Sequence, residues 1–155
     1  MFEWLHTLAI HGDEARAVAE ARVPADHPFL ADHFPGVPIL PGTLQIELCA
    51  QVAGPLVEEL AAGRDGGERW AFLGMVRSAT FHAPIKVPAT LAIFATATRA
   101  ERDSAVVQAV LSQAVDAVDC RVELVMMLRP PEPGWDEAVR VYRARIAALK
   151  ARARP

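Results

Sequence analysis

Apolar and charged residues alternate along two stretches near the start of the chain and along most of its second half. Residues 2–10 and 15–24 alternate around a turn at HGDE, which predicts two strands. Five more strand-like segments follow, separated by short tracts of turn-forming residues: WAFLGMV, ATFHAPI, TLAIFATATRA, AVVQAVLSQAV and CRVELVMML. The pattern therefore predicts two early strands and four or five later ones, ending near residue 129.

One helical pattern separates the two groups of strands. From Thr43 onward, large apolar residues recur about every fourth position, and other apolar residues widen this stripe until it nearly encircles the segment. The pattern predicts a buried helix, with a kink or break at Gly54 and Pro55 and a loop at GRDGGER, residues 63–69. Because strands and helices do not alternate, we expect an α+β domain whose largely antiparallel sheet wraps around one central helix.

A second helix is predicted at the end of the chain. Between residues 134 and 153, Trp135, Tyr142 and Leu149 belong to one apolar stripe at helical spacing, and most of the other positions are basic. Acidic residues near the start of this segment and basic residues near its end match the helix dipole. We therefore expect residues 1–130 to form a single domain and residues 134–153 to form an amphipathic helical extension packed on it.

Composition and charge favour a folded protein without a nucleic-acid or membrane partner. Of the 155 residues, 52% are hydrophobic and 23% are charged, and a formal net charge of -3 gives no electrostatic reason to expect nucleic acid. The first residues, MFEWLHTLAIHGDE, lack the basic segment and long apolar run of a signal peptide, and no stretch approaches the ~18 apolar residues of a membrane span. Cys49 and Cys120 do not form a metal-type pair. We expect a cytoplasmic protein without a metal site.

The segment before the central helix, HFPGVPILPG at residues 33–42, is rich in proline and glycine. Pro35, Pro38 and Pro41 fix three backbone dihedral angles and restrict the residues before them, so this loop has few conformations to choose from. Gly42 falls where the helix should begin, so its backbone N–H lacks an intrahelical partner and no side chain blocks the approach to it. Such an N–H can bind a carbonyl oxygen that gains negative charge.

Two ionisable residues flank the start of the helix. His33, at the entrance of the loop, can act as a base near neutral pH, and Glu47, inside the helix among apolar residues, would be kept protonated by burial and could act as an acid. A base, an acid and an oxyanion donor suit the removal of a proton next to a carbonyl with loss of a β-hydroxyl as water. Taken singly, His33 could instead be a structural hydrogen-bonding residue, and Glu47 could pair with an arginine or face the solvent.

The sequence HFPGVPILPGTLQIELCAQ, residues 33–51, closely resembles the active-site segment of the bacterial β-hydroxyacyl-acyl-carrier-protein dehydratases. The pattern of that family is H-F-P-G-x-P-x-x-P-G-x-L-x-x-E-x-x-x-Q, and the chain matches all ten fixed positions. A looser resemblance covers residues 15–128. The resemblance implies the hotdog fold, in which an antiparallel sheet wraps around a central helix. It also implies dehydration of a (3R)-3-hydroxyacyl-acyl-carrier-protein thioester to the trans-2-enoyl thioester.

The resemblance further implies a role for each residue of the motif. His33 would be the base that removes the C2 proton, Glu47 would be the acid that helps the 3-hydroxyl leave, and the Gly42 N–H would polarise the thioester carbonyl. Gln51, one turn beyond Glu47, would orient the carboxyl group. The family often has a non-proline cis peptide bond after the histidine, which here would join His33 to Phe34.

The implied partner is an acyl carrier protein, whose phosphopantetheine carries the acyl group, so no other cofactor is expected. In this family the histidine and glutamate of one site come from opposite subunits, which implies an inactive monomer and self-association as a dimer or a trimer of dimers. Glutamate at position 47 resembles the branch that only dehydrates; the branch that also isomerises the double bond usually has aspartate there. The extra C-terminal helix points to a specialised member in polyketide, aryl-polyene or lipid biosynthesis more than to the common fatty-acid enzyme.

Other interpretations stay open on the sequence alone. A hotdog thioesterase would use a carboxylate on the central helix to activate water and would not need His33 in the loop. A non-catalytic partner of a related dehydratase would keep the fold in a heterodimer, although both His33 and Glu47 are present here. The basic C-terminal helix could dock the acidic carrier protein, or it could pack on the sheet or on a neighbouring subunit with its arginines in solvent.

Overall fold

The computed structural model describes residues 3–31, 33, 36–65, 67–114 and 117–153. Its elements follow the chain in this order: β1 Leu5–His11, the 3-10 helix η1 Gly12–Glu14, β2 Arg16–Val23, α1 Pro28–Ala31, α2 Gly42–Asp65, β3 Trp70–Phe81, β4 Ala89–Ala100, β5 Ser104–Ser112, β6 Cys120–Arg129 and α3 Asp136–Arg152. The two early strands lie where the sequence predicts them. The short helix α1 lies between the second early strand and the loop at residues 33–42, where the sequence pattern predicts no helix.

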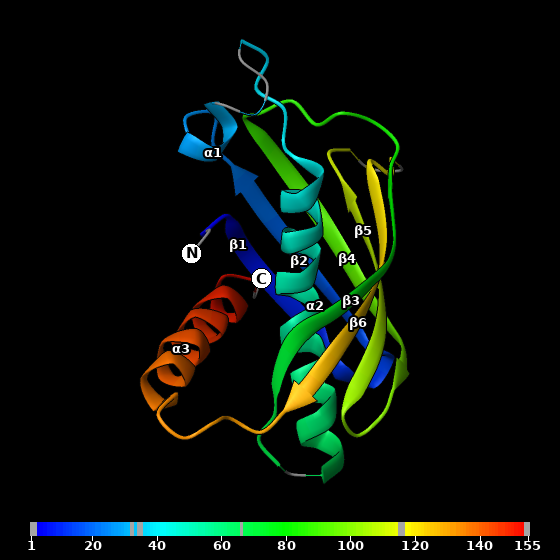
Figure 1. Cartoon of the computed structure of the whole chain (residues 1–155), viewed down its shortest axis with the longest axis vertical. Helices are drawn as coiled ribbons and strands as arrows, with labels where there is room; N and C mark the ends of the chain where they lie inside the picture. Colours follow the sequence, from blue (N-terminus) through cyan, green and yellow to red (C-terminus); the bar gives the residue numbers. More distant parts are fainter. Residues whose placement is uncertain (1–2, 32, 34–35, 66, 115–116, 154–155) are drawn as a thin grey trace.

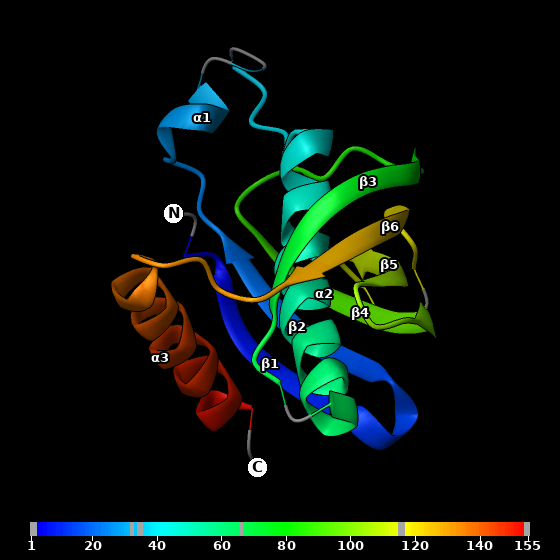
Figure 2. The ribbon, with the colours of Figure 1, turned by 60° about the horizontal axis from the view of Figure 1, so that its bottom comes forward.

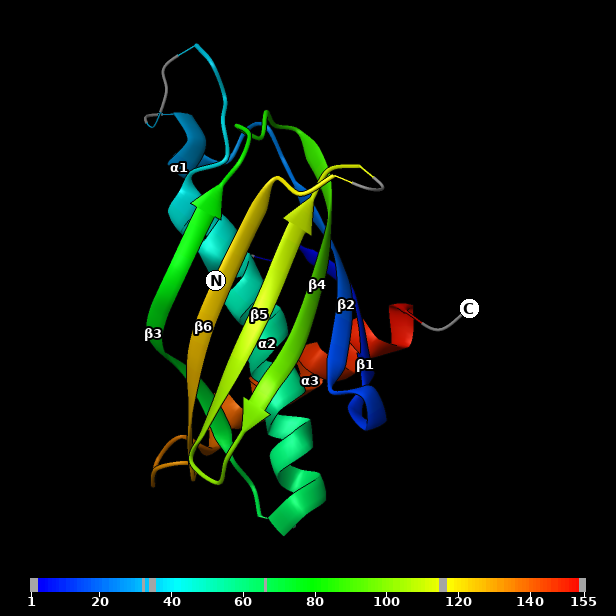
Figure 3. The ribbon, with the colours of Figure 1, turned by 90° about the vertical axis from the view of Figure 1, so that its right-hand side faces the viewer.

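The six strands found in the described residues form one antiparallel sheet in the order β1-β2-β4-β5-β6-β3, so that β1 and β3 are its edges. Figure 1 shows α2 running along the inside of the curved sheet, and Figure 3 shows the strands side by side with α2 behind them. The predicted α+β architecture, an antiparallel sheet around one central helix, is confirmed.

The segment WAFLGMV and the start of ATFHAPI belong to one strand, β3, so four strands follow α2 in the described ranges. The pairing of β3 with β6 slips at two places, where Gly74 and Arg77 are left out of the register. Each slip is a β-bulge, which inserts one extra residue and reverses the alternation of inward and outward side chains. The bulges explain why one strand looks like two in the sequence.

The central helix α2 begins at Gly42, where the sequence predicts it, and runs without interruption through Pro55 to Asp65. The predicted break is therefore wrong, and the first residues of GRDGGER are helical. Proline lacks the backbone donor that would bond to the carbonyl of Gln51. However, Gly54 and Pro55 are both buried against the rest of the protein, and this packing outweighs the loss of one hydrogen bond.

The core lies between α2 and the inner face of the sheet. Alternate residues of β4, β5 and β6 are buried and meet the buried side of α2. Fully buried side chains of this core include Leu48, Val52 and Leu56 from α2 and Leu91, Ile93, Leu111, Leu124 and Leu128 from the sheet. Because burial of large apolar side chains is the main stabilising term in folding, this core holds α2 in place along most of its length.

The C-terminal helix α3 spans the two edges of the wrapped sheet. It packs along β1 (Figure 2), and aromatic residues directly before it and in its first half contact β3. Trp70 of β3 lies 5.5 Å from Trp135 and stacks on Tyr142 at 5.4 Å, measured between ring centroids. Near the other end of α3, Leu149 is buried. Side chains of α3 also reach α2, so the helix covers part of α2 that the sheet leaves open.

Candidate active site

The proline loop before α2 is fastened to the segment that precedes β4. The Leu40 N–H donates to the carbonyl of Ile85 at 2.8 Å, and the Val87 N–H donates to the carbonyl of Pro38 at 3.0 Å. The buried side chain of Gln45, in the first turn of α2, donates to the Leu40 carbonyl at 3.1 Å. The loop is therefore tied to both the sheet side and the helix side of the molecule, as a rigid support for a site requires.

Gly42 is the first residue of α2. The ring of Phe81, at the end of β3, lies against it so closely that a β-carbon on residue 42 would come within 2.8 Å of the ring. Glycine therefore lets the end of β3 approach the start of α2. The Pro41 carbonyl accepts the N–H groups of Leu44 and Gln45 at 3.0 and 3.1 Å, so helical hydrogen bonding starts directly after the loop.

Glu47 and Gln51 lie one turn apart on α2, and their side chains are hydrogen-bonded. Gln51 Nε2 donates to Glu47 Oε1 at 2.8 Å, and both side chains are half-buried. They line a cavity of about 250 Å³ whose other walls are mostly apolar. The apolar wall residues include Leu5, Ala71, Phe72, Leu73, Met126, Ile146 and Leu149. The structure thus places the predicted acid beside its predicted orienting residue, at a largely apolar pocket.

His33 lies elsewhere, in the loop between α1 and α2, and is exposed. Neither His33 nor Gly42 lines the cavity beside Glu47. Phe34 and Pro35, and with them the predicted cis peptide bond after the histidine, lie outside the described residues. Within the described part of one chain, the candidate base and the candidate acid do not share a cavity.

Arg145 of α3 joins the group around Glu47 and is not part of the motif. Its Nη2 donates to Gln51 Oε1 at 3.2 Å, so Gln51 lies between Arg145 and Glu47. The sequence marks residues 134–153 as a basic amphipathic helix. Helical periodicity does not indicate which of several cations faces a given partner on another helix, so the sequence pattern alone could not select Arg145.

Most described basic residues of α3 interact with acidic or amide side chains of the same chain. The acidic partners are Glu137 for Arg140, Glu68 for Arg143 and Glu59 for Lys150. The pair of Glu137 and Arg140 lies within α3, whereas the contacts of Arg143 and Lys150 reach residues outside this helix and favour the interpretation in which α3 packs on its own domain. Docking of a carrier protein by this helix stays a prediction.

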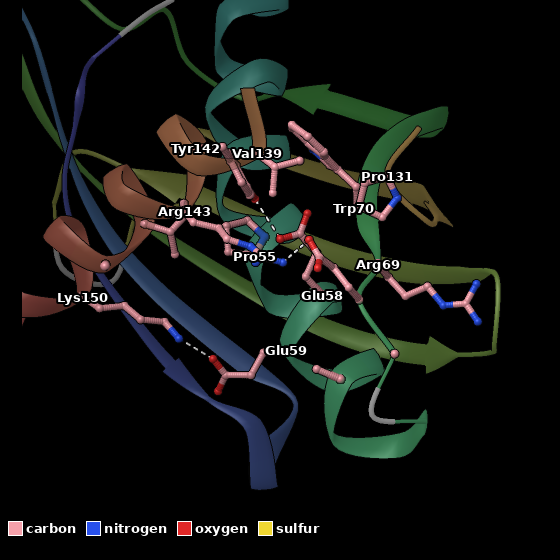
Figure 4. Close-up of a pocket in the computed structure, with 15 residues that line it drawn as sticks. Pro55, Glu58, Glu59, Arg69, Trp70, Pro131, Val139, Tyr142, Arg143 and Lys150 are labelled. Atoms are coloured by element: carbon pink, nitrogen blue, oxygen red, sulfur yellow. Dashed lines mark hydrogen bonds and ion pairs between the residues drawn. The ribbon is translucent and has the colours of Figure 1, made fainter. Parts of the chain in front are cut away.

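A second cavity, of about 400 Å³, lies between α2 and α3 (Figure 4). At its wall, Glu58 accepts hydrogen bonds from the Ala71 N–H at 2.8 Å and from the Tyr142 hydroxyl at 3.1 Å. Burial raises the pKa of Glu58 to about 7; the two hydrogen bonds and the nearby Arg143 oppose this shift, and Glu68 adds to it. One carboxyl group, whose pKa is raised by burial, therefore links α2, β3 and α3.

Replacing Glu58 with glutamine should stabilise the protein at pH 8 and leave its stability at pH 4.5 nearly unchanged. The folded chain binds the Glu58 proton more tightly than the unfolded chain, where the pKa is 4.5, so the free energy of unfolding falls as pH rises from 4.5 to about 7. For a partly exposed carboxyl we expect this loss to be about 2 kcal/mol, and neutral glutamine avoids it. Urea unfolding of both proteins at the two pH values measures the difference.

The matched control is Glu59→Gln, because Glu59 is the next residue on α2 and forms a more exposed ion pair with Lys150. Loss of this ion pair in the Glu59→Gln protein should change the free energy of unfolding by less than about 1 kcal/mol at either pH. If the Glu58→Gln protein were less stable than the wild type at pH 8, the Glu58 carboxylate would be holding α3 more strongly than its burial penalises folding.

In the described ranges, no helix has the length and apolar character needed to cross a membrane. The histidine, cysteine and acidic side chains of the same ranges form no cluster that could hold a metal ion.

The sheet, the central helix and the loop that leads into it define the class of protein, which is the hotdog fold. The solved structure of smu.793 from Streptococcus mutans, bound to acetyl CoA, has this architecture: the TM-score is 0.63 at 17% identity, over 85% of this chain and 94% of that one. The thioesterase HI1161 from Haemophilus influenzae gives a TM-score of 0.58 at 15% identity, over 78% and 77% of the two chains. At these identities the likeness concerns the fold alone.

Within this class, the chain belongs to the ApeI-like family, described as ApeI dehydratase, which matches residues 9–114. It is 41% identical over 69 residues to the 3-hydroxyacyl-[acyl-carrier-protein] dehydratase FabZ of Chlamydia trachomatis serovar L2. It is 37% identical over 68 residues to the FabZ dehydratase of Xanthomonas euvesicatoria. Each match covers 44% of this chain and 44% of the relative, so the chain spans less than half the length of these relatives.

Proposed function

We propose that the protein dehydrates a (3R)-3-hydroxyacyl thioester, carried on the phosphopantetheine of an acyl carrier protein, to the trans-2-enoyl thioester and water. The observation that carries this proposal is the Glu47 carboxyl group, which Gln51 holds at a largely apolar cavity. Membership of a dehydratase family and the full match to the motif around His33 support the same reaction. The proposal needs no cofactor other than the phosphopantetheine of the substrate.

In this reaction His33 and Glu47 transfer one proton each. His33 removes a proton from C2 while the thioester oxygen gains negative charge, which the Gly42 N–H at the start of α2 stabilises. The electron pair of the broken C2–H bond forms the C2–C3 double bond, and the C3–O bond breaks. Glu47 gives its proton to the departing hydroxyl, so water leaves. Afterwards His33 loses its added proton and Glu47 regains one by exchange with solvent.

A second copy of the chain completes the site in this proposal. β3 is an edge strand of the sheet. Its exposed large apolar residues are Phe72, Leu73, Met75, Val76 and Phe81, each at least 37% exposed. A long apolar edge strand is a ready surface for pairing with another strand. Because Phe72 and Leu73 also line the cavity beside Glu47, a second subunit paired along β3 would lie close to that cavity and could supply His33.

Incubation of the purified protein with a 3-hydroxyacyl-acyl-carrier-protein thioester, followed by mass spectrometry, tests this function. The expected product has lost one water and keeps the thioester. Release of the free acid would instead indicate a thioesterase. A homogeneous, folded protein that leaves the substrate unchanged would indicate a non-catalytic partner of a related dehydratase.

A further inference from the structure

A row of hydrogen bonds connects α3 to the proposed acid. Arg145 Nη2 donates to Gln51 Oε1 at 3.2 Å, and Gln51 Nε2 donates to Glu47 Oε1 at 2.8 Å. The three side chains are half-buried and line the same cavity. They therefore form one continuous polar row in a wall that is otherwise mostly apolar.

Arg145 decides which way the amide group of Gln51 faces. The oxygen of an amide only accepts hydrogen bonds, its nitrogen only donates them, and a guanidinium group has donors alone. With Arg145 donating to the amide oxygen, the amide nitrogen must face Glu47. Without Arg145, the amide could rotate by half a turn and present its oxygen to Glu47 instead.

The direction of the Gln51 amide decides where the acidic proton of Glu47 lies. In the proposed reaction Glu47 carries a proton; when the amide nitrogen donates to Oε1, that oxygen is the acceptor, and the proton is left on Oε2 for transfer to the substrate hydroxyl. When the amide oxygen faces the carboxyl group, it accepts this proton itself and withdraws it from the substrate. A fixed amide therefore keeps the proton of Glu47 available for transfer.

Contacts on both sides of Arg145 fasten α3 to α2. Before Arg145 in the helix, the Tyr142 hydroxyl donates to Glu58, and after it Lys150 pairs with Glu59. A docked helix restricts the positions that the arginine side chain can take, so less entropy is lost when it binds Gln51. This packing sets Arg145 apart from an arginine on a free surface segment.

We propose that Arg145 is a positioning residue, which orients Gln51 and through it keeps the Glu47 carboxyl group ready to protonate the leaving hydroxyl. The inference rests on the proposed dehydratase function and extends it. It gives α3, which lies beyond the family match at residues 9–114, a part in the chemistry of the site.

Arg145→Met tests this role, because methionine removes the donors and keeps an unbranched side chain. We expect kcat for dehydration to fall about ten- to a hundredfold and KM for the acyl thioester to change less than about threefold, since the substrate still binds while the acid is misoriented. Arg145→Lys, which keeps a donor, should recover part of the loss. A kcat of Arg145→Met within about twofold of the wild type would overturn the proposal.

The same substitution in a Gln51→Ala protein separates positioning from packing. If Arg145 acts through Gln51, the double variant should be no slower than Gln51→Ala alone; independent, multiplicative losses would contradict the proposal. Arg143→Met, which removes the ion pair with Glu68 from the same helix, is the matched control and should leave kcat within about twofold of the wild type. If Arg145→Met does not fold, Arg145→Lys replaces it, in the wild-type protein and in the Gln51→Ala protein. A loss of kcat in the wild-type background only would support the proposal, and the same loss in both backgrounds would contradict it.

Failure of this inference can be told apart from failure of the proposed function. A wild-type protein that forms no enoyl thioester contradicts both. An active wild type whose Arg145→Met variant is equally active contradicts only the role of Arg145.

Discussion

Glu47→Gln is expected to lower the rate of dehydration by at least about a hundredfold, because general acid–base catalysis typically contributes a factor of about 10²–10⁴. Glutamine has no proton of comparable acidity to give to the leaving hydroxyl. It has nearly the size of glutamate, and its amide oxygen can still accept the hydrogen bond from Gln51 Nε2, so the cavity should keep its shape. The rate of enoyl thioester formation in a single turnover, followed by mass spectrometry, measures the loss.

Glu58→Gln provides the control for this substitution. It makes the same chemical change on the same helix, but Glu58 does not line the cavity beside Glu47, and glutamine keeps an oxygen that can accept the hydrogen bond of the Tyr142 hydroxyl, so α3 stays docked. We expect its dehydration rate to stay within about twofold of the wild type. A wild-type rate in the Glu47→Gln protein would remove Glu47 from the role of acid.

Subunits that carry His33→Ala and subunits that carry Glu47→Gln should each be inactive alone and active together. In a heterodimer of the two, one site combines both altered residues, and the other combines the intact His33 of one chain with the intact Glu47 of its partner. Purified heterodimers should therefore recover about half of the wild-type rate per dimer. The exposed position of His33, away from the cavity beside Glu47, motivates this prediction.

Co-expression of the two chains with different affinity tags, followed by purification over both, yields the heterodimer. A pair in which both chains carry His33→Ala, purified in the same way, is the control and should stay inactive. If the histidine and the glutamate of one site came from the same chain, the heterodimer would contain no intact site. It would then be as inactive as either parent protein.

Local patterns predicted most of the fold, and the errors have physical causes. The helix start at Gly42 follows from a proline loop that cannot be helical and a run of apolar residues that can be. Pro55 was expected to interrupt the helix because it lacks a backbone donor, but its burial against the rest of the protein compensates for the lost hydrogen bond. Strand β3 was expected to be two strands because its bulges reverse the alternation that identifies a strand.

The sequence by itself determined the local part of the candidate site. The resemblance to the dehydratase motif implied that Gln51 orients the Glu47 carboxyl group, and a spacing of four residues on a helix, which puts both side chains on one face, explains why they are hydrogen-bonded. The motif also placed His33 and Gly42 on either side of a rigid loop.

Only the tertiary structure decided which distant residues join this site. Arg145 bonds to Gln51, which lies 94 residues away in the sequence, and Tyr142 of the same helix bonds to Glu58, 84 residues away. Periodicity fixes the face of a helix relative to its own axis, whereas such contacts depend on how α3 lies on β1 and across α2. That placement results from the packing of many side chains at once, including the aromatic contacts of Trp70 and the burial of Leu149.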